Sequence, residues 1–290
     1  MMYQIVSRED LAPRIHLFRI AAPFVARKAL AGQFIILRID EAGERIPLTI
    51  ADYDRELGTV TVVFMEVGKT STKLAGLQAG DSLATCVGPL GVPTEVERFG
   101  TVCCLGGGFG TATIFPIARA MKEAGNRVVS IIGFRSGDLL FWEDKMRSVS
   151  DEVIVTTDDG SYGRKGLVTE PLKELCEAGK IDRAVAIGPI PMMKFVSRTT
   201  EPFKVPTMVS LNPVMVDGTG MCGACRVSVG GATKFVCVDG PDFDGHLVNW
   251  DELAARNQIY RENEKLAMEL WQCSTCAEEA GDRQEKGVRA

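Results

Sequence analysis

Three cysteines lie close together in the sequence, at spacings that suit metal binding. Cys222 and Cys225 are two residues apart, and Cys237 follows the segment 226–236, which has the pattern of a short β-hairpin. Thiolates bind soft transition metals, and plant-type iron–sulfur sites use C-x4-C-x2-C followed by a distant cysteine. Asp217 stands at the first position of that frame, and its carboxylate is also an anionic ligand. The pattern predicts a [2Fe-2S] cluster held by Asp217, Cys222, Cys225 and Cys237.

Two other interpretations of these cysteines stay open. One is a structural zinc site in which Cys222 and Cys225 join Cys273 and Cys276. The other is ordinary buried or free cysteine. The second alternative conflicts with the high glycine content of the segment, because a core strand would not carry glycine at positions 218, 220, 223, 230 and 231.

The first 98 residues have the pattern of a small antiparallel β-barrel. Short β-rich runs recur and are separated by turn formers; the runs are 3–6, 15–20, 34–39, 59–65 and 82–87. Two segments in this region could meet a pyrophosphate. Arg45 to Thr49 combines a cation, a rigid turn at Pro47 and a hydroxyl, and 68–74 reads as a loop that enters a short helix. Each segment alone also fits a turn with a surface cation, or a helix N-cap.

The pattern changes at about residue 99. A buried strand at 101–105 runs into Gly106-Gly-Gly-Phe-Gly110-Thr111, an amphipathic helix follows at 112–124, and a second strand covers 127–133. Strand, glycine turn, helix and strand form the unit that holds a dinucleotide phosphate at a helix N-terminus. Thr111 replaces the third glycine of the usual fingerprint. We expect a parallel-sheet nucleotide domain.

Further βα units follow, and they place candidate ligand contacts at strand ends. Asp158 comes after the strand expected at 152–156, and Gly188-Pro189 comes after the one at 184–188. In an open parallel sheet, ligands bind at these carboxyl ends. Arg135 follows the second strand, where it could meet a 2′-phosphate, so residue chemistry alone favours NADPH.

Bulk properties narrow the function class. The 290 residues carry a net charge of −5, are 46% hydrophobic and contain no basic run, which argues against nucleic acid as a partner. No apolar stretch is long enough to span a membrane, and from the residues at the N-terminus we expect no secretory signal. Nine cysteines without a disulfide-scaffold pattern fit a reducing cytoplasm. We expect packing roles for the remaining cysteines at 86, 103, 104 and 176 and for His16 and His246, and a charged amphipathic helix over 252–271.

The order of barrel, nucleotide domain and cysteine hairpin resembles the ferredoxin–NADP reductase superfamily over about residues 1–255. Within it, the sequence resembles the electron-transfer subunits of bacterial dihydroorotate dehydrogenase. It is still more similar to the small subunits of NADH-dependent ferredoxin:NADP oxidoreductase, also called sulfide dehydrogenase β subunits. Asp217 in place of a first cysteine, and the run Cys237-Val-Asp-Gly-Pro-Asp-Phe-Asp-Gly, are typical of that branch.

The resemblance implies four regions and their ligands. They are an FAD-binding barrel (1–98), an NAD-binding α/β domain (99–208), a [2Fe-2S] domain (209–255) and a helical tail (256–290). It implies FAD contacts at Arg45, Pro47, Leu48, Thr49, Gly68, Ser71 and Thr72. It implies NAD contacts at Gly106, Gly107, Gly108, Gly110, Thr111, Arg135, Asp158, Gly188 and Pro189. It favours NADH over NADPH as the nucleotide of this chain.

The implied function is electron transfer between NADH, FAD and the cluster. The resemblance implies a large FAD and [4Fe-4S] flavoprotein subunit as partner, with ferredoxin handled by that partner, in an electron-bifurcating enzyme. Two alternatives remain: an electron-transfer subunit of dihydroorotate dehydrogenase or another oxidoreductase, and a zinc-stabilised flavoprotein assembly module.

Overall fold

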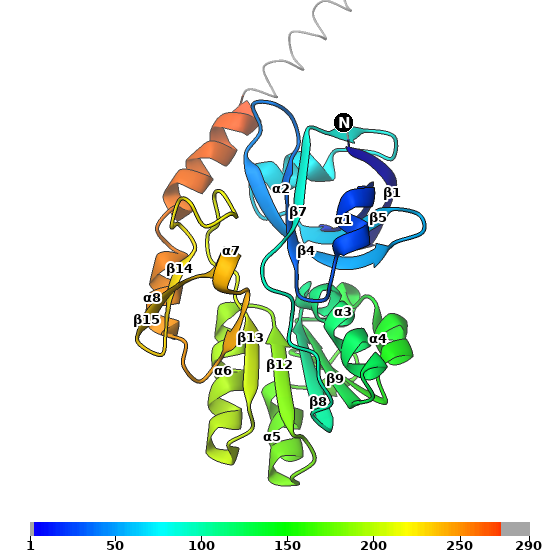
Figure 1. Cartoon of the computed structure of the whole chain (residues 1–290), viewed down its shortest axis with the longest axis vertical. Coiled ribbons are helices and arrows are strands. Elements are labelled where there is room, and N and C mark those ends of the chain that lie inside the picture. Colours follow the sequence, from blue (N-terminus) through cyan, green and yellow to red (C-terminus); the bar gives the residue numbers. More distant parts are fainter. Residues whose placement is uncertain (1–2, 274–290) are drawn as a thin grey trace, which may run out of the picture.

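The structure, a computed structural model, describes residues 3–273, which form a barrel, a parallel sheet flanked by helices, and a smaller cysteine-bearing region (Figure 1). The barrel strands run in the order β6-β1-β2-β5-β4-β3-β7. Their bounds are β1 Tyr3–Ala12, β2 Ile15–Ala21, β3 Phe34–Arg38, β4 Arg45–Asp54, β5 Thr59–Met65, β6 Ser82–Leu83 and β7 Thr85–Leu90, with helices α1 Pro23–Lys28 and α2 Lys69–Ala75.

The barrel is nearly closed. Its two edge strands, β6 and β7, are separated by a single residue, Ala84, so the two edges of the sheet lie close together. Its inner face is built from alternating apolar side chains, and Phe18, Ile20, Ile35 and Leu37 are almost completely buried. One expectation for this region is wrong. Pro47 is not a turn but lies inside β4, paired with Ile36 of β3, and the turn falls earlier, at 41–44.

The second part is an open sheet in the order β11-β10-β9-β8-β12-β13-β16. All strand pairs are parallel except β13–β16. The strand order reverses direction between β8 and β12, which is the switch point where open α/β sheets bind ligands. The strands are β8 Thr101–Gly107, β9 Arg127–Phe134, β10 Glu152–Thr157, β11 Arg164–Lys165, β12 Arg183–Ile187 and β13 Thr207–Ser210.

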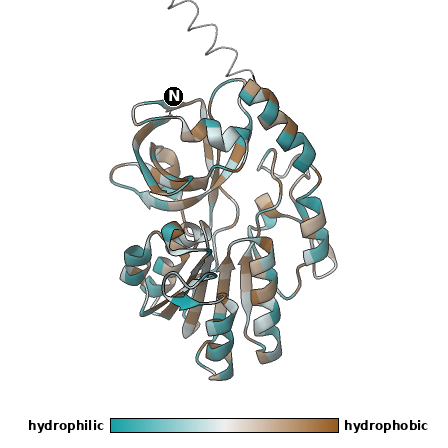
Figure 2. Cartoon of the chain, turned by 180° about the vertical axis from the view of Figure 1, so that it is seen from behind, coloured by the Kyte–Doolittle hydropathy of each residue, from teal (hydrophilic) through white to brown (hydrophobic). Residues whose placement is uncertain are grey.

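Helices cover both faces of this sheet, and its strands are the most continuously hydrophobic part of the chain (Figure 2). Parallel strands buried on both faces need such apolar runs. Helix α3 is buried along most of its length because it crosses the sheet beneath the barrel. The helices are α3 Gly110–Glu123, η1 Gly137–Leu139, α4 Glu143–Val149, α5 Thr169–Glu177, α6 Ile190–Thr200 and η2 Glu201–Phe203.

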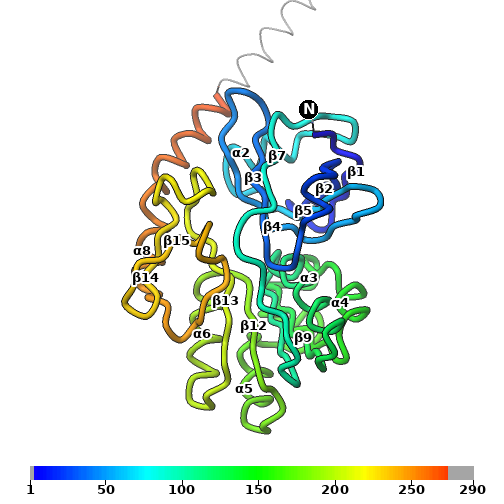
Figure 3. Tube along the Cα trace, in the orientation of Figure 1, coloured from blue at the N-terminus to red at the C-terminus, as the bar shows by residue number. Residues whose placement is uncertain are grey.

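The third part lies beside both others and begins after β13 (Figure 3). It holds the hairpin β14 Arg226–Val229 and β15 Ala232–Phe235, then α7 Val236–Asp239, β16 Asp242–Asp244 and α8 Trp250–Arg256. The hairpin is confirmed, but Cys237 lies on the short helix α7. Strand β16 returns to the nucleotide sheet and pairs with β13.

The chain after α8 differs from the expected single helix over 252–271. Helix α8 ends at Arg256, a turn occupies 257–260, and a second helix covers 261–273. That helix runs beside the barrel and is mostly exposed (Figure 1). Cys273 is exposed at its end, and Cys276 lies outside the described residues.

An ionic contact joins the barrel to the nucleotide domain. Asp52 of β4 accepts from Arg119 Nη1 at 2.8 Å and from Lys145 Nζ at 3.3 Å. Asp52 is less than a quarter exposed, so solvent screens this bridge less than a surface pair. This contact links β4 of the barrel to α3 and α4 of the nucleotide domain. Among residues 3–273, no helix is both long enough and apolar enough to cross a bilayer.

Candidate functional site: a cleft beside a cysteine loop

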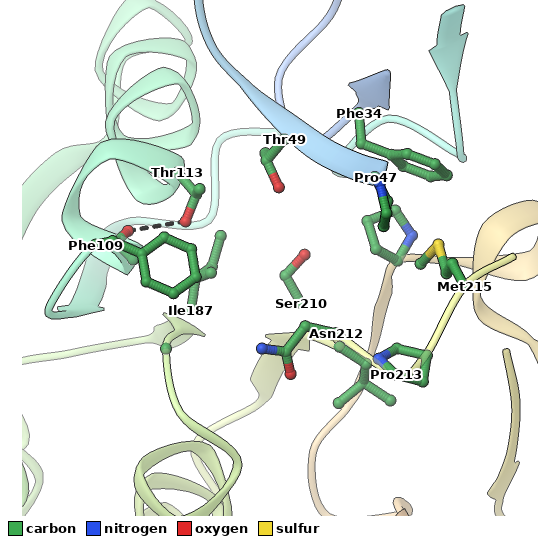
Figure 4. Close-up of a pocket in the computed structure, with 14 residues that line it drawn as sticks. Phe34, Pro47, Thr49, Phe109, Thr113, Ile187, Ser210, Asn212, Pro213 and Met215 are labelled. Atoms are coloured by element: carbon green, nitrogen blue, oxygen red, sulfur yellow. Dashed lines mark hydrogen bonds between the residues drawn. The ribbon is translucent and has the colours of Figure 1, made fainter. Parts of the chain in front are cut away.

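A cavity of about 170 Å³ opens where all three parts meet (Figure 4). Strands β3 and β4 form one wall, the start of α3 and the end of β12 form another, and the segment after β13 forms the third. The lining residues are Phe34, Pro47, Thr49, Phe109, Gly110, Thr113, Ile187, Gly188, Ser210, Leu211, Asn212, Pro213, Met215 and Pro241. A mostly apolar cleft with a few convergent hydroxyl and amide groups suits a flat ring system.

Four of the residues predicted from sequence come together in this cavity: Pro47, Thr49, Gly110 and Gly188. Thr49 and Ser210 direct their hydroxyl groups toward each other across it, and Asn212 lies below them (Figure 4). Leu48 does not line it, because the alternation of β4 directs its side chain to the barrel core. Sequence reasoning missed Ser210 and Asn212, although Ser210 ends β13 and Asn212 follows it, at the edge of the sheet where ligand contacts are expected.

In the turn after β8, close packing requires two of the glycines, and a third glycine faces open space. A Cβ on Gly110 would lie 2.4 Å from the carbonyl oxygen of Ile187, and one on Gly107 would lie 2.2 Å from Met192 Sδ. Gly108 has φ +56° and nothing within 4 Å of a Cβ position, so its surface is free for a ligand. The hydroxyl of Thr111 is buried without a hydrogen-bond partner. The turn therefore combines necessary glycines with an unsatisfied polar group.

The remaining predicted nucleotide contacts lie at neighbouring strand ends. The N–H of Asp158 donates to Phe134 O at 3.0 Å, and the N–H of Asp159 donates to Arg135 O at 3.3 Å. Arg135 is exposed. Pro189 packs against Gly107, with 3.1 Å from its Cδ to the Cβ position. The loops after β8, β9, β10 and β12 thus share one edge of the sheet, as predicted.

The barrel segment 68–74 enters α2 as expected, but its hydroxyl groups differ in availability. Ser71 Oγ accepts from the N–H groups of Val67 and Gly68 at 2.9 and 3.0 Å, so it already caps the helix start. Thr72 Oγ1 is buried and has no partner. Thr72 is therefore the hydroxyl in this segment that an additional ligand could satisfy.

Two of the three cysteines of the glycine-rich loop lie in contact with each other. Cys225 Sγ and Cys237 Sγ are 3.2 Å apart and buried, while Cys222 is exposed. Burial, together with the neighbouring Cys225 thiol, raises the pKa of Cys237 to about 12. The glycines at 218, 220, 223, 230 and 231 all have positive φ, so this backbone path requires them. This is the loop geometry that the sequence predicts, and it is not that of a core strand.

The Asp217 carboxylate forms its hydrogen bonds with Thr219. It accepts from the N–H of Thr219 at 3.0 Å and from the hydroxyl of the same residue. These bonds, with the charge of Arg45, lower the pKa of Asp217. Over residues 3–273, no three His, Cys, Asp or Glu side chains already converge as a metal site. The donor set of three thiols and one carboxylate fits an iron–sulfur cluster chemically, and both bonds to Thr219 use Oδ2 of Asp217.

The cysteine loop packs directly against the barrel wall that lines the cavity. A Cβ on Gly218 would lie 2.8 Å from Ile36 Cγ1 and 3.5 Å from Leu90 Cδ1. Arg45, two residues before Pro47 on β4, is close enough to Asp217 to influence its carboxylate. One strand, β3, therefore borders both the cavity, through Phe34, and the cysteine loop, through Ile36. A centre in the loop would lie beside a ring bound in the cavity.

Comparison with known proteins agrees with this geometry. Residues 212–249 match the iron–sulfur cluster binding domain of dihydroorotate dehydrogenase B. A Thermotoga maritima homologue of the dihydroorotate dehydrogenase B (NAD+) electron-transfer subunit is 48% identical over 266 residues, covering 92% of this chain and 94% of its own length. The electron-transfer subunit from Streptococcus mutans is 33% identical over 250 residues, covering 83% and 94% respectively.

A solved structure is also similar over nearly the whole chain. A chain of the NADH-dependent reduced ferredoxin–NADP oxidoreductase, described in connection with flavin-based electron bifurcation, has a TM-score of 0.89 and 47% identity. The match covers 94% of this chain and 98% of that one. The predicted fold class is confirmed: the similar chain comes from an NADH-dependent enzyme studied for flavin-based electron bifurcation, and residues 212–249 match an iron–sulfur cluster binding domain.

Proposed function

The chain belongs to the family of dihydroorotate dehydrogenase B electron-transfer subunits and their homologues, and we propose that it is the small subunit of an electron-bifurcating, NADH-dependent ferredoxin:NADP oxidoreductase. The observation that carries this proposal is the shared strand β3, which borders both the cavity, through Phe34, and the cysteine loop, through Ile36. When bound, FAD and the cluster supply the conversion of a hydride, a two-electron donor, into single electrons.

In this proposal, the barrel holds FAD. Pro47 and Thr49 contact the ring in the cavity, Arg45 and the backbone of Leu48 extend that wall, and Thr72 hydrogen-bonds the phosphate region with Gly68 and Ser71 beside it. The orphaned Thr72 hydroxyl supports this assignment, because a buried polar group without a partner is costly. The protein's contribution is to fix the ring in an apolar cleft that excludes water.

The nucleotide is held across the switch point. The turn Gly106–Thr111 and the pair Gly188–Pro189 contact the NADH phosphates and nicotinamide, and Arg135 and Asp158 contact its distal half. The buried Thr111 hydroxyl without a partner supports a ligand here. Because Gly110 and Gly188 line the same cavity as Pro47 and Thr49, this cavity would hold the nicotinamide next to the flavin ring.

A [2Fe-2S] cluster is held by Asp217, Cys222, Cys225 and Cys237. The Sγ atoms of Cys225 and Cys237 lie 3.2 Å apart, close enough to bind one cluster together, and binding would release their thiol protons. Of the four ligands, Cys222 is the exposed thiol, and its neighbour Met221 is 88% exposed. An electron can leave the cluster on this side.

The partner is a larger FAD and [4Fe-4S] flavoprotein subunit that handles NADP and ferredoxin. Exposed apolar side chains flank the cysteine loop in sequence: Val216 and Val238 are 52% and 43% exposed. They continue along the helix 261–273, where Leu266 and Leu270 are 53% and 63% exposed. An apolar surface next to a one-electron centre suits a protein acceptor.

The test compares the isolated chain with its native complex. The purified chain should reduce an artificial dye with NADH, yet show no NADH-dependent ferredoxin:NADP turnover until the large subunit is added. Co-purification from the native source should yield that subunit. Recovery of a lone chain that catalyses ferredoxin-dependent NADP reduction would refute the proposal.

A second candidate follows from the named relatives, which are dihydroorotate dehydrogenase B electron-transfer subunits. In that case the chain would relay electrons from a dihydroorotate-oxidising partner to NAD+. The co-purified partner decides between the two candidates. A partner that oxidises dihydroorotate supports the second, and a partner that carries FAD and [4Fe-4S] clusters supports the first.

A further inference from the structure

The end of helix α8 holds both halves of the site through two adjacent side chains. Arg256 Nη2 donates to the carbonyl oxygen of Ala224, between the two cysteines of the loop, at 3.1 Å. Asn257 Nδ2 donates to the carbonyl oxygen of Asn212, in the cavity wall, at 3.2 Å. Both residues lie beyond the region 212–249 that matches the cluster-binding family.

Helix α8 is itself fixed to the rest of the protein. The side chain of Asn249 accepts from the N–H of Glu252 at 3.1 Å and caps the helix. Asp251 pairs with Lys194 of α6 at 2.6 Å, and Leu253 is completely buried. Arg256 therefore projects from a helix that is anchored at its start and along its buried face.

The Arg256 guanidinium group is sheltered and carries a charge without a carboxylate partner. Its Nε is buried and has no hydrogen-bond acceptor. Across residues 3–273 it forms no ion pair. It lines a cavity of about 210 Å³ together with Cys222, Arg226 and Tyr260. A cation that is shielded from water acts more strongly on neighbouring charge than one on the surface.

The carbonyl groups of the cysteine turn both face arginines. Gly223 O accepts from Arg226 Nη1 at 3.3 Å, and Ala224 O accepts from Arg256. The negative ends of these two peptide dipoles are thus directed at guanidinium groups. Of the two arginines, Arg226 is exposed, so Arg256 is the one with the stronger electrostatic effect.

We propose that Arg256 is a positioning residue for the Cys222–Cys225 turn and that its uncompensated charge favours the reduced state of the cluster. The inference rests on the proposed [2Fe-2S] site. A reduced cluster carries one more negative charge than an oxidised one, so a fixed nearby cation stabilises the reduced state more. Outer-shell groups of this kind set metal-site potentials.

The test is an anaerobic redox titration of the intact chain, with EPR detection of the reduced cluster. The variants are Arg256→Gln, Arg256→Lys and a matched control, Arg261→Gln. Arg261 bonds Gln258 at 3.2 Å on the adjacent exposed helix, and its loss changes net charge equally. Arg256→Gln should lower the ratio of reduced to oxidised cluster at fixed ambient potential about tenfold, which is 59 mV for one electron.

Arg256→Lys keeps the charge but not the planar guanidinium geometry. It should shift the ratio less than Arg256→Gln and still alter the EPR line shape, whereas Arg261→Gln should match the parent. Equal potentials and line shapes for the parent and Arg256→Gln would overturn the proposal, and so would an equal shift from Arg261→Gln. If Arg256→Gln loses its iron, a parental line shape in Arg256→Lys overturns it. A parent chain without iron would instead refute the proposed function.

Discussion

A buried carboxyl group beside the cavity gives a sharp prediction about pH and stability. Asp242 of β16 is the Cα partner of Ser210, which lines the cavity. Its Oδ2 accepts from Thr94 Oγ1 at 2.5 Å, while its Oδ1 is shielded from water and has no partner. Burial raises the pKa of Asp242 from 3.8 to about 6, and the hydroxyl groups of Thr94 and Ser210 oppose that rise.

The pKa shift fixes the sign and size of the effect. An acid whose folded-state pKa is raised favours folding when protonated, so this contribution is complete below pH 3.8 and is lost as the pH rises through 6. The whole change is on the order of 3 kcal/mol at 1.36 kcal/mol per pKa unit. About 1.4 kcal/mol of it falls between pH 5 and pH 8.

Asp242→Asn removes the titration and keeps an acceptor for Thr94. Urea unfolding of the FAD- and iron-loaded chain at pH 5, 6, 7 and 8 measures both proteins, and the difference between them cancels all other titrating groups. The variant should gain about 1.4 kcal/mol relative to the parent between pH 5 and pH 8. A difference that stays constant across this range, or that changes in the opposite direction, would show that the carboxyl group is not held protonated by burial.

Three further predictions concern nucleotide and partner. Gly110→Ala should raise the KM for NADH at least tenfold with FAD and iron retained, because its Cβ would lie 2.4 Å from Ile187 O; steady-state dye reduction measures this. The parent should prefer NADH, and Arg135→Ala should lower only the residual rate with NADPH. A strong NADPH preference in the parent would contradict the NADH assignment and would indicate that Arg135 binds the 2′-phosphate. Deleting 261–290 should weaken binding of the large subunit, measured by calorimetry, without loss of either cofactor.

Local patterns in the sequence were enough to predict much of the fold. The glycine turn before α3 and the cysteine hairpin are defined by residue type and spacing over short distances, and both are present. Pro47 was misinterpreted because proline usually marks a turn. The structure accommodates it in the part of β4 that pairs with β3 alone, where its missing N–H costs no second ladder.

The parts of the site that were not predicted depend on contacts distant in sequence. Ser210 lines the cavity only because β13 pairs with β12. Its partner on β16, Asp242, lies 32 residues later in the chain. Likewise, the break after Arg256 follows from the hydrogen bonds that Arg256 and Asn257 make to Ala224 and Asn212. No periodicity in 252–271 carries that information, since the amphipathic pattern continues through the turn.

The central claim is that a cysteine–aspartate loop on this chain carries a [2Fe-2S] cluster next to a bound flavin. Metal, acid-labile sulfide and flavin analysis of anaerobically purified parent and Asp217→Ala protein tests it most directly. The account predicts about two irons, two sulfides and one FAD per parent chain. The variant should keep its FAD and lose much of its iron, because one of four ligands is gone. Zinc without iron in the parent would contradict the cluster, and unchanged iron content and EPR signal in the variant would contradict Asp217 as a ligand.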